Sequence, residues 1–209
     1  MTAACEIGMV LDTLRNPGGE VCVLDMAMAE SLCTRPAKMN TSLSTVFSSG
    51  VKHLVCVINT DRRQGSGTHW RVCVLTRSVA VANQWQLSLV DPAGSRAGSG
   101  FHNWYKTLWA NLHCMGQALI TGYTFVQGWE QGANNTLCGE VCVATIADFI
   151  QTGALTSRDP NNALIPSSNL TDAIGWLADA RAQIAARMST VQERDAGDDD
   201  HIDLTSDTE

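Results

Sequence analysis

Four residues of the chain carry the functional groups needed for acyl transfer, in the order histidine, aspartate, glutamine and cysteine. They are His69, Asp91, Gln131 and Cys138. A cysteine hydrolase needs a thiolate nucleophile, a base, a group that orients the base and a donor to the oxyanion. Each of the four residues lies at the edge of a predicted helix or strand, where catalytic groups are often found. The pattern therefore indicates chemistry at a thiol.

Cys138 directly precedes Gly139 and a predicted helix. A sulfur at a helix N-terminus lies close to the first backbone N–H groups and to the positive end of the helix dipole, which together favour a thiolate. Gly139 has no side chain, so a substrate carbonyl can approach the backbone amides there. On local context alone, the alternative interpretation of Cys138 as a buried structural cysteine stays open.

His69 and Asp91 are expected to meet across a hairpin. His69 follows a glycine-containing turn and precedes a predicted strand, which suits a general base, whereas Asp91 comes where the next strand ends. When two such strands pair antiparallel, the start of one lies beside the end of the other. The carboxylate would then orient the imidazole and stabilise the imidazolium. Taken singly, His69 is typical of a surface residue and Asp91 of a plain turn.

The elements that must position these residues follow from hydrophobic periodicity and from glycine and proline breaks. Short β-branched and alternating runs predict strands, and apolar residues at helical spacing predict helices. Helices and strands in this order predict one α+β domain over residues 1–190. The expected helices are 20–33, 101–114, 139–152 (closed by Gly153) and 170–190, and the expected strands are 53–59, 70–76, 85–90 and 118–126, with a hairpin near Asn83.

Charge is concentrated at the C-terminal end. The net charge is −7, and residues 193–209 alone contain eight acidic residues and one basic residue, so residues 1–192 are neutral overall. A neutral domain without a basic cluster predicts no nucleic-acid partner. Residues 191–209 are expected to form a disordered acidic tail.

The sequence favours an intracellular location. The N-terminus has no basic region followed by an apolar core, and no apolar run approaches the ~20 residues that span a bilayer, so we expect neither a signal peptide nor a membrane segment. Four of the eight cysteines (Cys22, Cys56, Cys73 and Cys142) lie in apolar, periodic segments, which is typical of buried free thiols in a reducing compartment.

Together, His69-Trp70, Asp91, Gln131 and Cys138-Gly139 resemble the motifs of the Ulp/SENP-type ubiquitin-like-protein proteases and of the related adenoviral protease. In that superfamily the order is His-Trp, Asp or Glu, Gln and Cys-Gly, whereas papain-like enzymes place the cysteine first. The resemblance covers roughly residues 10–190. It implies a papain-like α+β fold in which helices flank a central mixed sheet.

The resemblance also implies roles and a substrate. Gln131 would donate its side-chain amide to the oxyanion, with the backbone N–H of Cys138 as the second donor. Trp70 would flank a narrow groove that admits a Gly-Gly tail next to Gly139, although a core position for Trp70 is equally compatible. The implied activity is cleavage of peptide or isopeptide bonds after a Gly-Gly-type C-terminus, with SUMO or another ubiquitin-like protein as the partner.

Two departures from the cellular proteases leave an alternative substrate open. Gln131 precedes Cys138 by seven positions, as in the adenoviral enzyme, and Leu137 stands where the cellular enzymes usually carry Asp. The segment 16–20 has no aromatic residue where SUMO proteases carry a second Trp, so a clamp of two tryptophans is in doubt. Both features favour a viral or transposon protease that processes a polyprotein.

The tail contains a second signal for a SUMO partner. Ile202, Asp203, Leu204 and Thr205, flanked by acidic residues, resemble a SUMO-interacting motif. Such a segment can add as a strand to a sheet edge while the acids meet a basic rim. A solvated tail without a binding role is the alternative.

Further alternatives are an effector acetyltransferase that uses the same triad and an inactive SUMO-binding adaptor. The first would need an acyl-CoA site, for which the sequence has no basic cluster, and the intact triad argues against the second. We expect no cofactor and no metal, because Cys138 and Cys142 have no matching His/Cys pair nearby.

Overall fold

The computed structural model describes residues 4–14, 19–25, 28–29, 32, 46–47, 50–59, 69–94, 99–132, 136–158 and 164–197 of the chain. Its elements are α1 (Ala4–Thr13), β1 (Val21–Val23), β2 (His53–Asn59), β3 (Trp70–Arg77), β4 (Gln84–Val90), α4 (Ser99–Cys114), β5 (Ala118–Phe125), α5 (Cys138–Thr152) and α6 (Ser167–Gly197). The strands form one sheet in the order β1-β2-β3-β4-β5. Its outer pairs are parallel and its inner pairs antiparallel, so the predicted α+β class with a mixed sheet is confirmed.

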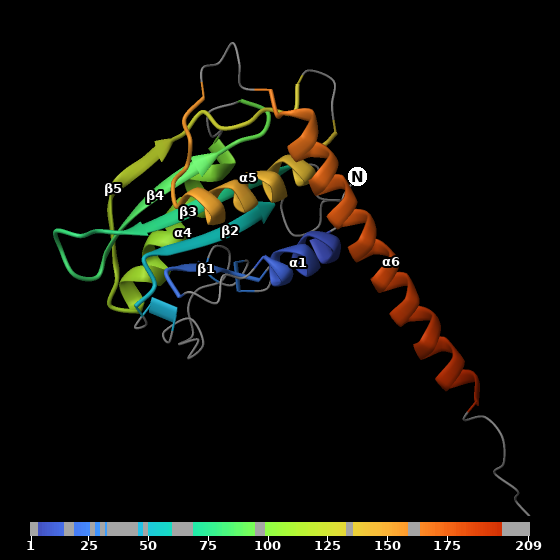
Figure 1. The fold of residues 1–209 in the computed structure, drawn as a ribbon. Coiled ribbons are helices and arrows are strands. Elements are labelled where there is room, and N and C mark those ends of the chain that lie inside the picture. Colours follow the sequence, from blue (N-terminus) through green and yellow to red (C-terminus); the bar gives the residue numbers. More distant parts are fainter. Residues whose placement is uncertain are drawn as a thin grey trace, which may run out of the picture.

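Helices cover both faces of the sheet (Figure 1). On one face, α1, α5 and α6 pack against side chains such as Val55, Val72 and Val74. On the other face, α4 packs against side chains such as Cys73, Leu75 and Leu87. Because successive strand residues point to opposite faces, the apolar run in β3 supplies both cores at once.

The predicted strands and the later helices are confirmed in existence and type, with ends that differ by a few residues. The hairpin between β3 and β4 turns at Asn83, which has a positive φ of 60°. Helix α5 ends at Gly153, whose φ of 72° lets its N–H bond the Phe149 carbonyl oxygen. Both residues are types that adopt the left-handed conformation readily.

The prediction of a helix over 20–33 is wrong at its beginning. Val21–Val23 is strand β1, which pairs parallel to β2 through Val21 and His53. The Asp25 carboxylate accepts the Met28 N–H at 2.7 Å, and residues 28–29 are helical. The alternating β-branched residues and the free edge of β2 outweigh the helical spacing of the later residues.

One helix was not predicted, and another is longer than predicted. Helix α1 was not predicted from the sequence; it buries Ile7, Val10 and Leu11 against α5 and α6. Helix α6 continues to Gly197, so residues 191–197 are helical and do not belong to a disordered tail. Figure 1 shows its C-terminal half extending away from the rest of the molecule. Residues 198–209, including the predicted SUMO-interacting motif, lie outside the described residues.

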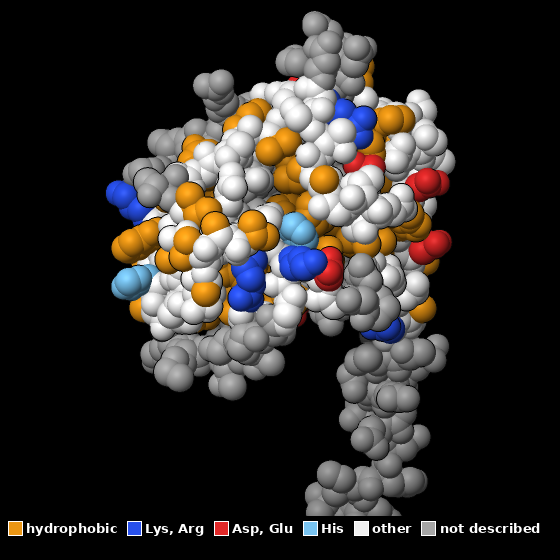
Figure 2. Space-filling view, turned by 60° about the vertical axis from the view of Figure 1, so that its left-hand side comes forward, with side chains coloured by type: hydrophobic (Ala, Val, Ile, Leu, Met, Phe, Trp, Pro, Cys, Tyr) orange, Lys and Arg blue, Asp and Glu red, His pale blue; other side chains and the backbone are white. Residues whose placement is uncertain are grey.

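The surface carries both charge signs. On the face in Figure 2, basic side chains are scattered among hydrophobic and polar ones. Among the described helices, none combines the length and the apolar character that a bilayer crossing requires. The seven cysteines within the described ranges are all free thiols.

Close packing at Gly128 yields a test of the fold. A Cβ added at Gly128 would lie 2.4 Å from Cγ1 of Val90, a β-branched side chain that cannot move aside easily. We expect Gly128→Ala to lower the free energy of unfolding by about 1–3 kcal/mol, measured by urea denaturation. The control is Gly175→Ala in α6, where a Cβ meets nothing within 4 Å and should raise stability by up to about 1 kcal/mol. Equal stabilities of the two variants would contradict the packing at Gly128.

Candidate active site

His69 and Asp91 form a hydrogen-bonded pair at one end of the β3–β4 hairpin. The distance between His69 Nε2 and Asp91 Oδ1 is 2.6 Å. Strand β3 begins directly after His69 and β4 ends directly before Asp91, and Val72 pairs with Val90 in the ladder. The antiparallel register thus brings together two residues that are 22 positions apart.

The Asp91 carboxylate is fully buried and has several partners. Its Oδ1 also accepts the Ala93 N–H at 2.9 Å, and its Oδ2 accepts the Arg71 Nε–H at 2.7 Å. Asp91 has no exposed side-chain surface, whereas the His69 side chain is 20% exposed. A carboxylate in this environment is held in one orientation, and the imidazole it contacts remains reachable from solvent.

Cys138 completes a triad with these two residues. The hydrogen bond that His69 donates to the Asp91 carboxylate raises the pKa of His69 to about 9, and a hydrogen bond with Cys138 adds to that increase, although burial acts in the opposite direction. His69 therefore contacts Asp91 and Cys138 at the same time. Because Nε2 faces Asp91, the other ring nitrogen, Nδ1, is the one available to Cys138.

The start of α5 places Cys138 next to potential oxyanion donors. Cys138 is the first residue of the helix and is 5% exposed, and Gly139 beside it is buried. Leu137 at the N-cap makes no side-chain cap hydrogen bond. The first N–H groups of a helix lack intrahelical acceptors, so here they can donate hydrogen bonds to an oxyanion that forms next to the Cys138 sulfur.

Gln131 lies on the loop between β5 and α5 and is tied to the Asp91 turn. Its backbone N–H donates to the Pro92 carbonyl oxygen at 2.8 Å. Its side-chain Oε1 is buried and has no hydrogen-bond partner within the described part of the chain. Because an amide group can rotate by half a turn with little change in shape, Nε2 can occupy the same place. A buried polar atom without a hydrogen-bond partner is costly. With Nε2 in this place, the amide N–H could donate to an oxygen of the substrate.

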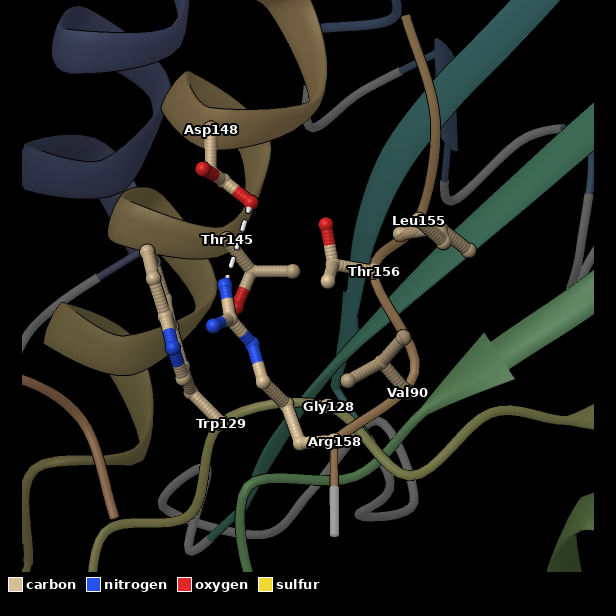
Figure 3. A pocket seen from close by; sticks show the side chains of 8 residues that line it. All are labelled: Val90, Gly128, Trp129, Thr145, Asp148, Leu155, Thr156 and Arg158. Carbon is tan, nitrogen blue, oxygen red and sulfur yellow. Dashed lines mark ion pairs between the residues drawn. The ribbon is translucent and has the colours of Figure 1, made fainter. Parts of the chain in front are cut away.

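Arg158 contacts the loop that carries Gln131 at two residues before it, Gln127 and Trp129. The Arg158 backbone N–H donates to Gln127 O at 2.7 Å, and its guanidinium lies 4.8 Å from the centre of the Trp129 ring. Figure 3 shows this side chain along Trp129 and directed toward Asp148 on α5, with which it forms an ion pair at 3.7 Å. None of the triad residues lines the small pocket around these side chains.

Trp70 has a core position. Its indole is 3% exposed and belongs to the core cluster that contains Cys138, and its Nε1–H is buried without a partner among the residues described. The role of Trp70 in a substrate groove therefore stays a prediction, as does that of Gly139. No group of three or more His, Cys, Asp or Glu side chains in the described ranges could hold a metal ion.

Arg71 and Glu130 were not among the predicted site residues. Arg71 was detectable as a charged residue inside an apolar strand, two positions after His69. The contact of Glu130 had no sequence signal, because its carboxylate packs against Gly94, across the Asp91 turn. It depends on how two distant loops meet.

The contact between Gly94 and Glu130 can be tested through activity. A Cβ at Gly94 would lie within 2.4 Å of Glu130 Oε1, so Gly94→Ala should displace the neighbour of Gln131 and lower kcat. The matched control is Gly116→Ala, because Gly94 and Gly116 have similar positive φ values of 65° and 70° but Gly116 has open space around it. We expect kcat to fall roughly tenfold or more in Gly94→Ala alone. If kcat falls equally in both variants, the cause is backbone strain at a positive φ and not the contact with Glu130.

Comparisons with known proteins agree with this geometry. No protein-family model and no curated protein matches the sequence. Among solved structures, the Xanthomonas campestris effector protein XopD bound to ubiquitin is similar, with 13% identity, a TM-score of 0.57, and coverage of 86% of this chain and 92% of XopD. The SUMO protease Ulp1, with its catalytic cysteine oxidised to a sulfonic acid, has 14% identity, a TM-score of 0.53, and coverage of 85% and 77%.

A viral enzyme shares the architecture as well. The ASFV pS273R protease has 14% identity and a TM-score of 0.54, and the match covers 81% of this chain but only 65% of that protease. Identities this low show the fold alone. The chain thus has the fold of the Ulp-type cysteine proteases, and the resemblance inferred from the motifs is confirmed.

Proposed function

We propose that the protein is a cysteine peptidase that hydrolyses the bond after a Gly-Gly-type C-terminus of SUMO or another ubiquitin-like protein. The observation that carries this proposal is the position of His69, which hydrogen-bonds Asp91 and Cys138 at once. A base between an orienting carboxylate and a nucleophile at a helix N-terminus is the arrangement that activates a thiol.

The reaction would begin with proton transfer from the Cys138 sulfur to Nδ1 of His69. The thiolate then attacks the substrate carbonyl carbon, and the resulting oxyanion is bound by the Gln131 amide and the N–H groups at the start of α5. The imidazolium returns its proton to the leaving amine, and a thioester forms on Cys138. Water, deprotonated by His69, attacks the thioester, which releases the carboxylic acid and the free thiol.

Burial of the nucleophile supports a substrate with glycines at the cleavage site. Cys138 is only 5% exposed and Gly139 is buried beside it, so an extended chain without side chains reaches the sulfur more easily than a bulky one. The ubiquitin bound to XopD and the SUMO activity named for Ulp1 favour the same substrate class. The tail motif at Ile202–Thr205 would add a second contact to SUMO.

A viral or transposon protease that processes a polyprotein is the second candidate. The seven-residue spacing from Gln131 to Cys138 and the absence of an aromatic residue in 16–20 favour it. The ASFV protease among the structural neighbours is consistent with it. The two candidates share the same chemistry and differ only in the chain that precedes the cleaved bond.

The raised pKa of His69 predicts the alkaline limit of activity. His69 stays protonated, and can donate a proton to the leaving amine, below a pKa of about 9, compared with an ordinary value of 6.5, so kcat/KM should fall as the pH rises through about 9. Asp91→Asn removes the largest cause of the increase. Asp91→Asn should therefore shift the alkaline decline of kcat/KM to lower pH and reduce kcat by roughly 10²–10⁴-fold. If kcat/KM of Asp91→Asn declines at the same pH as that of the wild type, another group is responsible for the decline.

Probes made from SUMO and from ubiquitin, each with an electrophile at the C-terminus, test the substrate. We expect the SUMO probe to label the wild-type protein and Cys138→Ala to abolish labelling. Cys142→Ala is the matched control, because Cys142 lies one helical turn further and burial raises the pKa of its thiol well above the usual range. Labelling by neither probe, in a protein whose Cys138 still reacts with iodoacetamide, would reject the ubiquitin-like substrate.

A further inference from the structure

Arg71 is a buried cation in a strand of apolar residues. It is 9% exposed, and Val72, Cys73 and Val74 follow it inside the two cores. A buried charge is costly unless it is paired and hydrogen-bonded. Arg71 pairs with Asp91, so an ion pair with a residue of the triad offsets the desolvation penalty of this cation.

The register of the hairpin produces this contact. Val72 pairs with Val90, so the next residues outward, Arg71 and Asp91, stand opposite each other at the end of the ladder. Arg71 Nε donates to Oδ2 at 2.7 Å, while Oδ1 accepts from His69 and from the Ala93 N–H. Each carboxylate oxygen thus has its own donor, and rotation of the carboxylate would break these bonds.

The positive charge of Arg71 also acts on two buried thiols, one on α5 and one on β3. Burial raises the pKa of the Cys142 thiol, and the positive charge of Arg71 opposes that increase. The same charge opposes the increase for Cys73 on β3. Arg71 is therefore a nearly buried charge that donates a hydrogen bond to Asp91.

We propose that Arg71 is a positioning residue of the triad, which fixes the Asp91 carboxylate with Oδ1 toward His69 and balances the charge of that fully buried carboxylate. Arg71 acts only through Asp91, because its contact is on the oxygen that His69 does not use. Its effect should therefore appear in the reactivity of Cys138. The inference rests on the proposed thiol chemistry and is independent of the substrate.

The test is a double-mutant cycle with Arg71→Met and Asp91→Asn. The readout is the rate at which iodoacetamide alkylates Cys138 at neutral pH, located by mass spectrometry, which requires no substrate. We expect Arg71→Met to slow alkylation roughly tenfold in the wild-type background and to have little effect in Asp91→Asn. A purely structural role predicts the same loss in both backgrounds, and that result would overturn the inference.

Conservative variants keep the test decisive if Arg71→Met does not fold. Arg71→Lys retains the charge, whereas Arg71→Gln retains only a neutral donor, so alkylation should be faster in Arg71→Lys. Equal rates, or a faster Arg71→Gln, would contradict the role assigned to the charge. Circular dichroism and thermal melts of each variant show that the fold is retained.

Steady-state kinetics on a SUMO–aminomethylcoumarin substrate separate this inference from the proposed function. We expect Arg71→Met to lower kcat with KM unchanged within about twofold, because Arg71 does not contact the substrate. A rise in KM at constant kcat would overturn the positioning role. If the wild type does not cleave this substrate but alkylation still depends on Arg71, the inference stands and the SUMO assignment fails.

Discussion

The hydrogen bond between His69 and Asp91 is the interaction on which the candidate site depends. It exists because β3 and β4 pair antiparallel, with Val72 opposite Val90, so that residues at the start of one strand and the end of the other meet. A one-residue shift in this register would turn Asp91 to the other face of the sheet. The buried hydrophobic residues on both faces prevent that shift, so the two cores fix the geometry of the candidate site.

The other parts of the site are delivered to this pair by packing. Helix α5 buries most of its residues against the sheet, α1 and α6, and this sets the position of Cys138 at its first turn. The loop with Gln131 is held by a hydrogen bond to Pro92 and by Arg158 stacked on Trp129. Three segments of the chain thus converge at one end of the hairpin, and each is fixed by contacts outside the triad.

Local signals explain why much of this arrangement follows from the sequence. The β-branched run at 53–59, the turn at Asn83 and the glycine after α5 each specify their element with little help from tertiary contacts. The meeting of His69 and Asp91 follows from the hairpin, once the strands are placed. The resemblance to Ulp-type proteases added the place of Gln131.

Tertiary context decides the features that sequence reasoning missed. Val21–Val23 forms a strand because β2 offers a free edge, although its neighbours have helical spacing. Helix α1 is short and gains its stability from α5 and α6, which the sequence does not show to be nearby. The Arg71 contact needs the register of two strands, and the contact between Gly94 and Glu130 needs two loops to meet.

Titration of the His69 ring by NMR detects the effect of both neighbours of the imidazole without a substrate. We expect His69 to titrate with a pKa of about 9 in the wild type, and at a lower pH in Cys138→Ser and in Asp91→Asn. Assignment of the signal follows from its loss in His69→Gln. A pKa near the ordinary 6.5 in the wild type, unchanged in both variants, would contradict a triad of Cys138, His69 and Asp91.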